Sequence, residues 1–391
     1  MREKSSFLME SFQRHIRQYT MIIALLGIWI LFFFLTQGIF LTPRNLSNLF
    51  LQTTPVAIVA IGMVLVIVTN NIDLSIGSFA AFTGAVAAVL QVKCGWSAFP
   101  TFVVTICVGL LIGAFHGFWI ARCRVPAFIV TLSTMLMLRG GVLGVTGGAT
   151  ISGLSPGMKA LGAGYLPSIF SNNPKFDDTT LYVAIIAIIA TVIVAFRQRA
   201  KRVHYGFHVP SMGIELLKIL GISVVIAVIA SIMMFNAGIP YCVLLLAVLT
   251  MIIHFIANRT TFGRHLYAIG GNIEAAKLSG IDTKKHLMLL FIFFGGLTAI
   301  SGMVMTARLD AATAAAGNAM ELDVIAATVI GGTSFLGGEG TIIGAIVGAL
   351  VMASLDNGMS LMNLDVTYQY VVKGLILLLA VWVDISTRNK S

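Results

Sequence analysis

Apolar runs long enough to cross a membrane recur along the chain and constrain its fold more than any other feature. They occupy residues 21–41, 54–69, the stretch ending at 92, 99–121, 128–145, 181–196, 214–235, 240–257, 287–307 and 367–383. A helix needs about 20 apolar residues to cross a bilayer. Only 10% of the residues are charged and the mean hydropathy is +0.97, whereas soluble domains carry roughly 25% charged residues. We therefore predict an all-α, polytopic helical membrane protein, with residues 1–391 forming a single transmembrane domain in contact with membrane lipid.

The distribution of lysine and arginine predicts how the chain is oriented in the membrane. Basic residues concentrate on the cytoplasmic side of membrane helices. They cluster in residues 1–20, in the basic loop 197–213, in 258–286 and at the C-terminus, so both termini are expected in the cytoplasm. The weakly charged loop 146–180 is expected in the periplasm. The net charge of +10 follows from this distribution, and we expect no nucleic-acid partner.

Two segments have ambiguous membrane topology. Residues 42–50, TPRNLSNLF, form a short polar link that suits a position along the membrane surface. Residues 321–355 form two short apolar arms hinged on glycines, either a re-entrant hairpin or two crossings. The chain then crosses the membrane ten or twelve times. The short first arm favours ten.

The segment 258–286, NRTTFGRHLYAIGGNIEAAKLSGIDTKKH, is the longest well-mixed polar stretch in the chain. Within it, EAAKLSG (residues 274–280) predicts a short helix ended by Gly280, since glycine readily adopts the left-handed conformation that terminates helices. Small residues at Ala275 and Ala276 would let another surface approach closely. The segment is therefore either a docking element for a soluble partner or a solvated connection between two spans.

Ionisable residues at membrane depth are candidates for a polar path. Asp73 lies where two apolar runs meet, in TNNIDLSIGS. A carboxylate in this position usually faces protein or a water-filled path; alternatively, Asp73 caps the next helix at a hairpin tip. Arg139, late in its span, either pairs with Asp73 or Glu321 or, as we favour, extends to the outer interface.

Glycine patterns favour helix packing over nucleotide binding. The stretch GGTSFLGGEGT (residues 331–341) lacks the Gly-Lys-Ser/Thr ending of a phosphate-binding loop. Glycines spaced four residues apart let membrane helices approach closely, and two such sets occur, Gly340, Gly344 and Gly348, and Gly109, Gly113 and Gly117. We find no catalytic motif, no metal-ligand spacing among the cysteines and histidines, and hence no indication of an enzyme.

The residues Glu274-Ala275-Ala276 followed by Gly280 resemble the EAA motif of bacterial ABC-importer permeases. The wider stretches TTFGRHLYAIGGNIEAAKLSGI, NIDLSIGS, VPAFIVTLSTMLMLRG and ELDVIAATVIGGTSFLGGEGT resemble the ribose, xylose, arabinose and galactose branch of that family. The tail, SLDNGMSLMN followed by YQYVVKGLILLLAVWVD, is most similar to the D-xylose permeases. The similarity covers nearly the whole chain and is weakest over 160–215.

The resemblance implies the permease subunit of an ATP-driven monosaccharide importer of the bacterial cytoplasmic (inner) membrane. Its partners would be an ABC ATPase subunit, a periplasmic sugar-binding protein and a second permease copy forming a homodimer. This chain would carry no cofactor, since ATP and magnesium bind the ATPase. The segment 258–286 would be the coupling loop through which the ATPase switches the permease between inward and outward states. Its candidate residues are Gly263, Arg264, Gly270, Gly271, Asn272, Glu274, Ala275, Ala276, Ser279 and Gly280.

A sugar path needs hydroxyl and amide groups more than charges. The candidate path residues are Asn71, Asp73, Ser75, Arg139, Asn318, Glu321, Asp323 and Thr328. The main alternative is an ion-coupled secondary transporter, which needs titratable groups in the membrane such as Asp73, Glu321 and Asp323. A channel-like subunit, or a permease of the same family for ribose, arabinose or galactose, are further alternatives.

Overall fold

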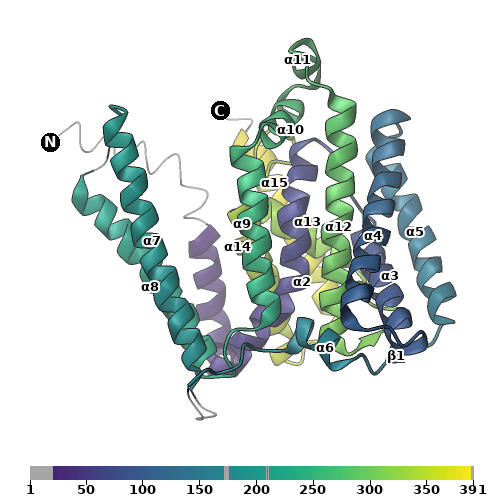
Figure 1. Cartoon of the computed structure of the whole chain (residues 1–391), viewed down its shortest axis with the longest axis horizontal. Coiled ribbons are helices and arrows are strands. Elements are labelled where there is room, and N and C mark those ends of the chain that lie inside the picture. The colour runs from purple at the N-terminus through teal and green to yellow at the C-terminus, as the bar shows by residue number, and fades with distance from the viewer. Residues whose placement is uncertain (1–20, 171–175, 208, 210, 389–391) are drawn as a thin grey trace.

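Helix α2, Pro43–Val68, stands at the centre of the bundle (Figure 1). The computed structural model describes residues 21–170, 176–207, 209 and 211–388; the predicted cytoplasmic N-terminus, residues 1–20, lies outside them. In the most apolar 18-residue window of α2, 89% of the residues are buried. The helices packed around it are α9 (Tyr241–Arg259), α12 (Thr283–Leu309), α13 (Met320–Ile330) and α14 (Ile342–Leu361). A helix that is apolar on every side is stable only when it is surrounded in this way or by lipid.

Ten helices in the described part of the chain are long and apolar enough to cross a membrane, which confirms the predicted architecture. Besides α2, α9, α12 and α14 they are Ile76–Lys93 (α3, Ile76–Ala88, continued by η2, Val89–Lys93), Ala98–Arg122 (α4, Ala98–Gly117, continued by η3, Phe118–Arg122), α5 (Ala127–Thr146), α7 (Asp178–His204), α8 (Met212–Met234) and α15 (Val366–Arg388). The predicted first span, 21–41, contains the apolar helix Met21–Leu35, which is shorter within the described residues, and α14 is the tenth spanning helix in its place.

The predicted surface link at residues 42–50 is wrong, because these residues belong to α2. Thr42 is the N-cap of α2, its hydroxyl accepts the backbone N–H of Asn45, and Pro43 occupies the first helical turn. Proline suits that turn because its missing N–H has no intrahelical partner there. The preceding turn is η1, Ile39–Leu41.

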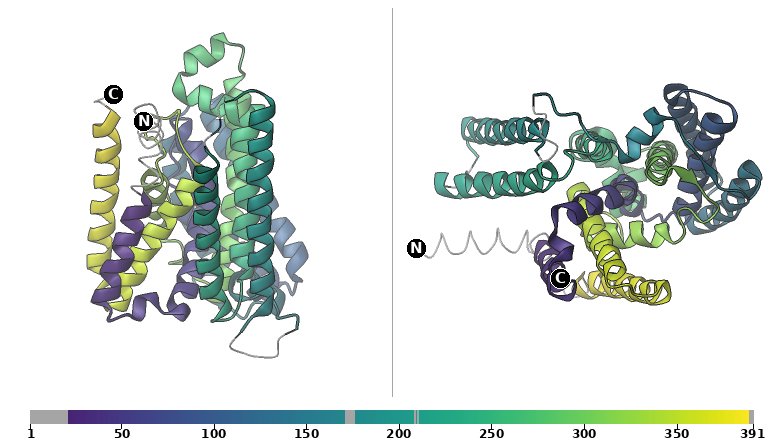
Figure 2. Two further views of the ribbon diagram at one scale, coloured as in Figure 1. Left: turned by 90° about the vertical axis from the view of Figure 1, so that its left-hand side faces the viewer. Right: turned by 90° about the horizontal axis from the view of Figure 1, so that it is seen from below.

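Helices α7 and α8 pack on each other and stand to one side of the bundle (Figure 2). The predicted basic loop 197–213 is helical over much of its length, because α7 continues through the basic residues to His204 and α8 begins at Met212. The weakly charged loop 146–180 contains α6 (Pro156–Ala163) and strand β1 (Ile151–Ser152), which pairs antiparallel with β2 (Ala311–Ala312). This pair lies at the end of the bundle opposite α11 (Figure 1).

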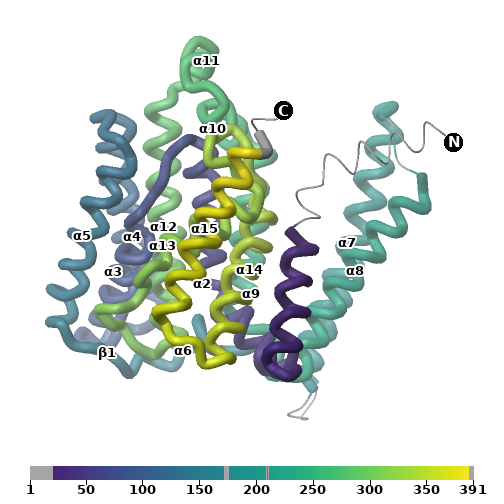
Figure 3. The backbone as a smooth tube through the Cα atoms, turned by 180° about the vertical axis from the view of Figure 1, so that it is seen from behind, coloured from purple at the N-terminus to yellow at the C-terminus, as the bar shows by residue number. Residues whose placement is uncertain are grey.

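The ambiguous segment 321–355 is a hairpin of unequal arms. Helix α13 has 11 residues, too few to cross a bilayer as a helix, whereas α14 has 20. The connecting 331–341 loop contacts the end of α2, where the amide of Gly338 donates to the carbonyl of Val68 over 2.9 Å. It also reaches α15, since the Phe335 amide donates to the Asp384 carboxylate over 3.1 Å. The C-terminal end of α15 lies at the same end of the bundle as α10, Thr261–Gly271 (Figure 3).

Close helix packing explains both glycine sets, with one correction. A Cβ atom placed on Gly113 would lie 2.2 Å from the Phe291 carbonyl oxygen, so α4 and α12 approach backbone to backbone. Likewise, a Cβ on Gly348 would lie 1.9 Å from the Ala327 carbonyl oxygen of α13. Gly340, however, precedes α14 and belongs to the 331–341 loop. The four-residue spacing therefore correctly predicted all three glycines of the α4 face. On the α14 face it was correct for Gly344 and Gly348 only.

Candidate functional site: the coupling segment and the polar residues of the bundle

The segment 258–286 is mostly helical, with α10 followed by α11, Ile273–Leu278. The Thr260 hydroxyl accepts the Gly263 amide at the start of α10, and the Asn272 side-chain oxygen accepts the Ala275 amide at the start of α11. Such side-chain acceptors satisfy backbone N–H groups that have no partner within the helix. Helix α11 ends as predicted, with Gly280 in the left-handed conformation at φ +82°. Helix α11 projects beyond the end of the bundle (Figure 1).

The exposed surface of α11 differs from the predicted one. Ala275 is exposed, but Ala276 is only 4% exposed and cannot be a docking contact. Leu278, which the sequence analysis overlooked, is 91% exposed, and Ile273 is 42% exposed. The available signal was a leucine beside Lys277 and Ser279 in a segment expected to be solvated. An apolar side chain this exposed at a projecting tip suits insertion into a partner's surface.

The other coupling-loop candidates divide between supporting and exposed positions. Gly263 and Gly270 are buried where their backbone touches neighbouring segments, whereas Arg264, Gly271, Asn272 and Glu274 are exposed. Glu274 forms an ion pair with Lys277 over 2.7 Å. The Ser279 hydroxyl donates to the Ala275 carbonyl. The arrangement thus combines a closely packed base with a tip that exposes both polar and apolar side chains.

Asp73 lies in a buried, non-helical break between α2 and α3. The break is not an exposed hairpin tip, because Asp73 and Ser75 are both 0% exposed. One carboxylate oxygen accepts the amide of Ser75 over 2.8 Å and its hydroxyl over 2.6 Å, which orders the start of α3. The other oxygen lies 3.3 Å from Nδ1 of His116 on α4. Sequence reasoning missed His116, since nothing in its local sequence signals a partner.

The remaining polar candidates in the described part of the chain form no hydrogen bond with Asp73. Arg139 donates to the carbonyls of Ala314 and Ala316 over 2.8 and 3.0 Å, close to β2. It is therefore not the partner of Asp73. The Asn71 amide group donates to Thr69, and the Thr328 hydroxyl donates to the Val324 carbonyl within α13. Asn318 is exposed.

Glu321 lies where α13 begins beside the start of α3. A Cβ on Gly77 would lie 2.6 Å from the Glu321 carboxylate and 2.0 Å from the Gly317 carbonyl oxygen. The start of α3 and the non-helical segment before α13 are therefore in close contact. Non-helical backbone at membrane depth is tolerated where protein buries it or where it lines a cavity.

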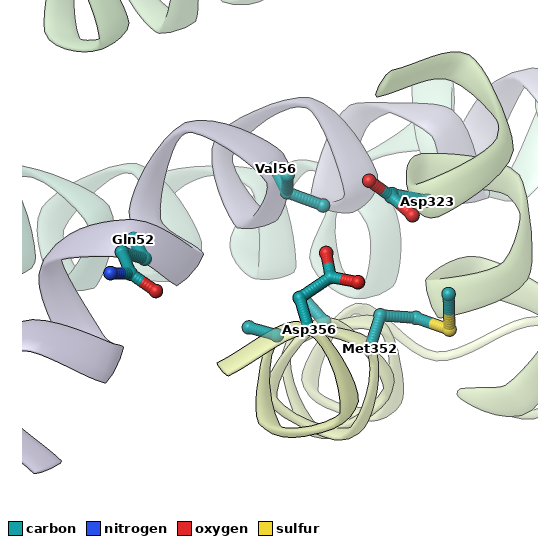
Figure 4. A pocket seen from close by; sticks show the side chains of 7 residues that line it. Gln52, Val56, Asp323, Met352 and Asp356 are labelled. Atoms are coloured by element: carbon teal, nitrogen blue, oxygen red, sulfur yellow. The ribbon is translucent and has the colours of Figure 1, made fainter. Parts of the chain in front are cut away.

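Asp323 belongs to a second polar cluster, formed with Asp356 of α14 and Lys373 of α15. The Lys373 ammonium lies 3.0 Å from Asp323 and 2.8 Å from Asp356. A cavity of about 60 Å³ lies between α2, α13 and α14. Figure 4 shows the two carboxylates directed toward it. Sequence reasoning found Asp323 but missed its two partners, which are distant in the chain.

The predicted path residues therefore do not converge on one site. They divide between the Asp73 break and the Asp323 cluster, which α13 connects. In the described ranges we find no group of three or more His, Cys, Asp or Glu side chains arranged to hold a metal ion. The geometry offers a projecting docking element at one end of the bundle and two buried polar clusters within it.

Comparison with known proteins identifies the class of protein. Residues 45–381 match the family described as the permease component of the branched-chain amino acid transport system. The chain belongs to this family and is a multi-pass membrane permease subunit.

Individual relatives are more specific than the family description. The chain is 43% identical to the xylose transport system permease protein XylH of Escherichia coli (strain K12), over 96% of this chain and 94% of that protein. It is also 43% identical to XylH of Haemophilus influenzae, over 96% and 98% of the two chains. The identity to the ribose import permease protein RbsC of Escherichia coli (strain K12) is 33%, over 88% and 87%. No solved structure matches the chain.

Proposed function

We propose that this chain is the membrane-spanning permease subunit of an ATP-driven importer of D-xylose. Support for the substrate comes from its relatives, since the xylose permeases match it at 43% identity and the ribose permease at 33%. Import of ribose or another monosaccharide by the same mechanism is the second candidate. The identity to the ribose permease over most of both chains favours it over unrelated functions.

The observation that carries the ATP-driven mechanism is the projecting helix α11. It presents Ala275 and the apolar side chain of Leu278 to solvent on a short, well-capped helix. An isolated ion-coupled carrier has no evident use for such an element. We infer that α11 inserts into an ABC ATPase subunit, which binds ATP and magnesium and catalyses hydrolysis. In this proposal α11 and both chain termini lie in the cytoplasm of a bacterial inner-membrane protein, as the basic residues at the two ends of the sequence favour.

Two further partners complete the proposed complex. A periplasmic sugar-binding protein would deliver the sugar at the end of the bundle opposite α11, where the 146–180 loop lies. A second permease copy would form a homodimer, because closed two-fold assemblies are the commonest oligomers. None of the residues in the apolar window of α15 is buried within one chain, so this helix is available to a second copy or to lipid.

Alternating access requires the polar clusters to open first to one side of the membrane and then to the other. Both carboxylates of the Asp323 cluster face a cavity, and Asp73 lies at a break between helices, a common position for substrate groups in transporters. Repacking of α3, α13 and α15 would join these regions into a path. The hydroxyl and amide groups of Asn71, Ser75, Asn318 and Thr328 would supply further contacts to a neutral sugar.

Transport into proteoliposomes tests this function. The vesicles contain the permease, its ATPase and its binding protein, and uptake of labelled xylose is measured with ATP or a non-hydrolysable analogue. We expect uptake only with ATP, and stronger competition by unlabelled xylose than by ribose or arabinose. Stronger competition by ribose would show that ribose, and not xylose, is the preferred substrate. Uptake driven by a proton or sodium gradient without ATP would overturn the ATP-driven mechanism.

A further inference from the structure

Asn70 occupies a junction of three segments: the end of α2, the end of α10 and the 331–341 loop. Its side-chain amide donates to the carbonyl of Gly270, the penultimate residue of α10, over 3.1 Å. On its other side it lies against Gly337, where an added Cβ would be 2.5 Å from the Asn70 amide oxygen. Asparagine suits this position because its φ is +59°, a left-handed conformation that asparagine tolerates better than most residues.

A second contact joins α10 to the 331–341 loop. The Tyr267 hydroxyl donates to the carbonyl of Gly340 over 2.8 Å. Burial raises the pKa of this phenol above its usual value of 10.0, so the hydroxyl remains a donor at any physiological pH. Tyr267 and Asn70 thus attach α10 to both neighbouring segments by side-chain hydrogen bonds.

The backbone segments at this junction are also closely packed. A Cβ on Gly270 would lie 1.6 Å from the Val68 carbonyl oxygen, and the same carbonyl accepts the Gly338 amide over 2.9 Å. The end of α10, the end of α2 and the loop are therefore in direct backbone contact. Closely packed interiors transmit displacement because they have little room to deform.

Two of the three segments at the junction, the end of α2 and the 331–341 loop, continue into the polar clusters. Asn70 is followed within three residues by Asp73, through the non-helical break that leads to α3. The 331–341 loop joins α13, which carries Asp323, to α14, which carries Asp356. The junction is the place where the base of the projecting α11 element contacts both segments.

We propose that Asn70 and Tyr267 are positioning residues that transmit movement of α10 and α11 to the Asp73 break and to the α13–α14 hairpin. The inference rests on the proposed ATP-driven function and adds to it the residues that couple sugar transport to ATP hydrolysis. Neither side chain belongs to α11, so neither is needed for α11 to contact an ATPase. Without them, α10 can move under ATPase closure while the polar clusters follow it less completely.

The test compares sugar imported with ATP hydrolysed in the proteoliposomes described above. Tyr267→Phe removes one hydroxyl, and Asn70→Gly removes the side chain while tolerating the positive φ. A hydrogen bond contributes a net free energy equivalent to about fivefold in an equilibrium. We therefore expect each variant to hydrolyse ATP at the wild-type rate but to import about fivefold less xylose per ATP, with a larger loss in the double variant.

Two control variants match these changes outside the junction. Asn363→Gly replaces another asparagine with positive φ, +52°, just after α14, and Tyr368→Phe removes a hydroxyl from a tyrosine that is 64% exposed. Both are expected to retain the wild-type ratio of import to hydrolysis. Co-purification with the ATPase establishes that each variant assembles.

The outcomes separate this inference from the proposed function. If the wild-type complex shows no ATP-driven uptake, the proposed function fails. If the wild type imports sugar and Tyr267→Phe and Asn70→Gly keep its import-to-hydrolysis ratio, the inference is overturned. An equal loss of hydrolysis and import would also overturn it, because the junction would then act on assembly or ATPase activity and not on transmission.

Discussion

At the scale of single residues, the buried charged side chains of the bundle lie beside polar or oppositely charged partners. Asp73 has Ser75 and His116 beside it, and Asp323 and Asp356 share Lys373. The shared lysine is the more consequential arrangement, because one ammonium group is the ion-pair partner of two carboxylates. Its side chain is 13% exposed and that of Asp323 is 12% exposed, so water can compensate little for its loss.

Lys373→Met should destabilise the permease strongly. It leaves two carboxylates facing each other, and removing one partner of a buried ion pair costs about 3–5 kcal/mol. Thermal unfolding of purified permease in detergent measures the effect. Lys277→Met is the matched control, because Lys277 pairs with Glu274 on the surface, where ion pairs contribute about 0–1 kcal/mol. Equal unfolding temperatures for the two variants would contradict the role given to Lys373.

Gly280→Ala should impair coupling, whereas Gly271→Ala should not. Neither added methyl group would meet another atom within 4 Å, but Gly280 alone has a positive φ, +82°. A side chain in that conformation costs about 1–2 kcal/mol and should disturb the end of α11. The measurement is ATP-driven uptake together with binding of the ATPase. If both variants behave like wild type, the left-handed turn has no part in docking.

At the scale of elements, the helices depend on backbone contact as well as side-chain packing. Helix α4 lies against α12 through Gly109, Gly113 and Gly117, and α14 lies against α13 through Gly344 and Gly348. Between membrane helices the hydrophobic effect contributes little, so close van der Waals packing has to hold them together.

Gly113→Ala should separate α4 from α12. The new Cβ would lie 2.2 Å from the Phe291 carbonyl oxygen, and overpacking of this kind costs about 1–3 kcal/mol. Gly144→Ala on α5 meets no atom within 4 Å and should be neutral or slightly stabilising, because alanine favours helix over glycine. Thermal unfolding compares the two. A Gly113→Ala protein as stable as the Gly144→Ala protein would contradict the packing described for α4 and α12.

The presence of membrane-spanning helices was predictable from the sequence, because the length and apolarity of a segment suffice to identify one. Nine of the ten spanning helices and the end of α11 at Gly280 follow from such local signals, whereas α14 lies in the segment 321–355, whose topology the sequence left open. The helical start of α2 was missed because polar residues such as Asn45 and Asn48 lie in it. Local signals also misplaced Ala276, since the burial of one face of α11 depends on how the chain turns back toward Ile281.

The partners within the site were not predictable, because they come from distant parts of the chain. His116 reaches Asp73 from α4, and Lys373 reaches Asp323 from α15. Spacing along one helix carries no information on such pairs. The junction at Asn70 was hidden for the same reason, since it joins residues near 70, 270 and 338.

For the whole molecule, we propose that force received at one end of the bundle moves the polar clusters in its interior. Helix α11 projects from that end, α10 connects it to α2 and the 331–341 loop, and those segments lead to the two polar clusters (Figure 3). The peripheral α7–α8 hairpin makes few contacts with this path and is not required by it.

ATP-driven uptake of labelled xylose by the reconstituted complex tests this claim most directly, with wild type compared with Gly280→Pro. Proline cannot adopt the φ of +82° found at Gly280, because its ring holds φ near about −65°. The account predicts ATP-dependent uptake by wild type and its loss in the variant, with the variant's helical content and unfolding temperature retained. Uptake that is independent of ATP, or undiminished in Gly280→Pro, would contradict it.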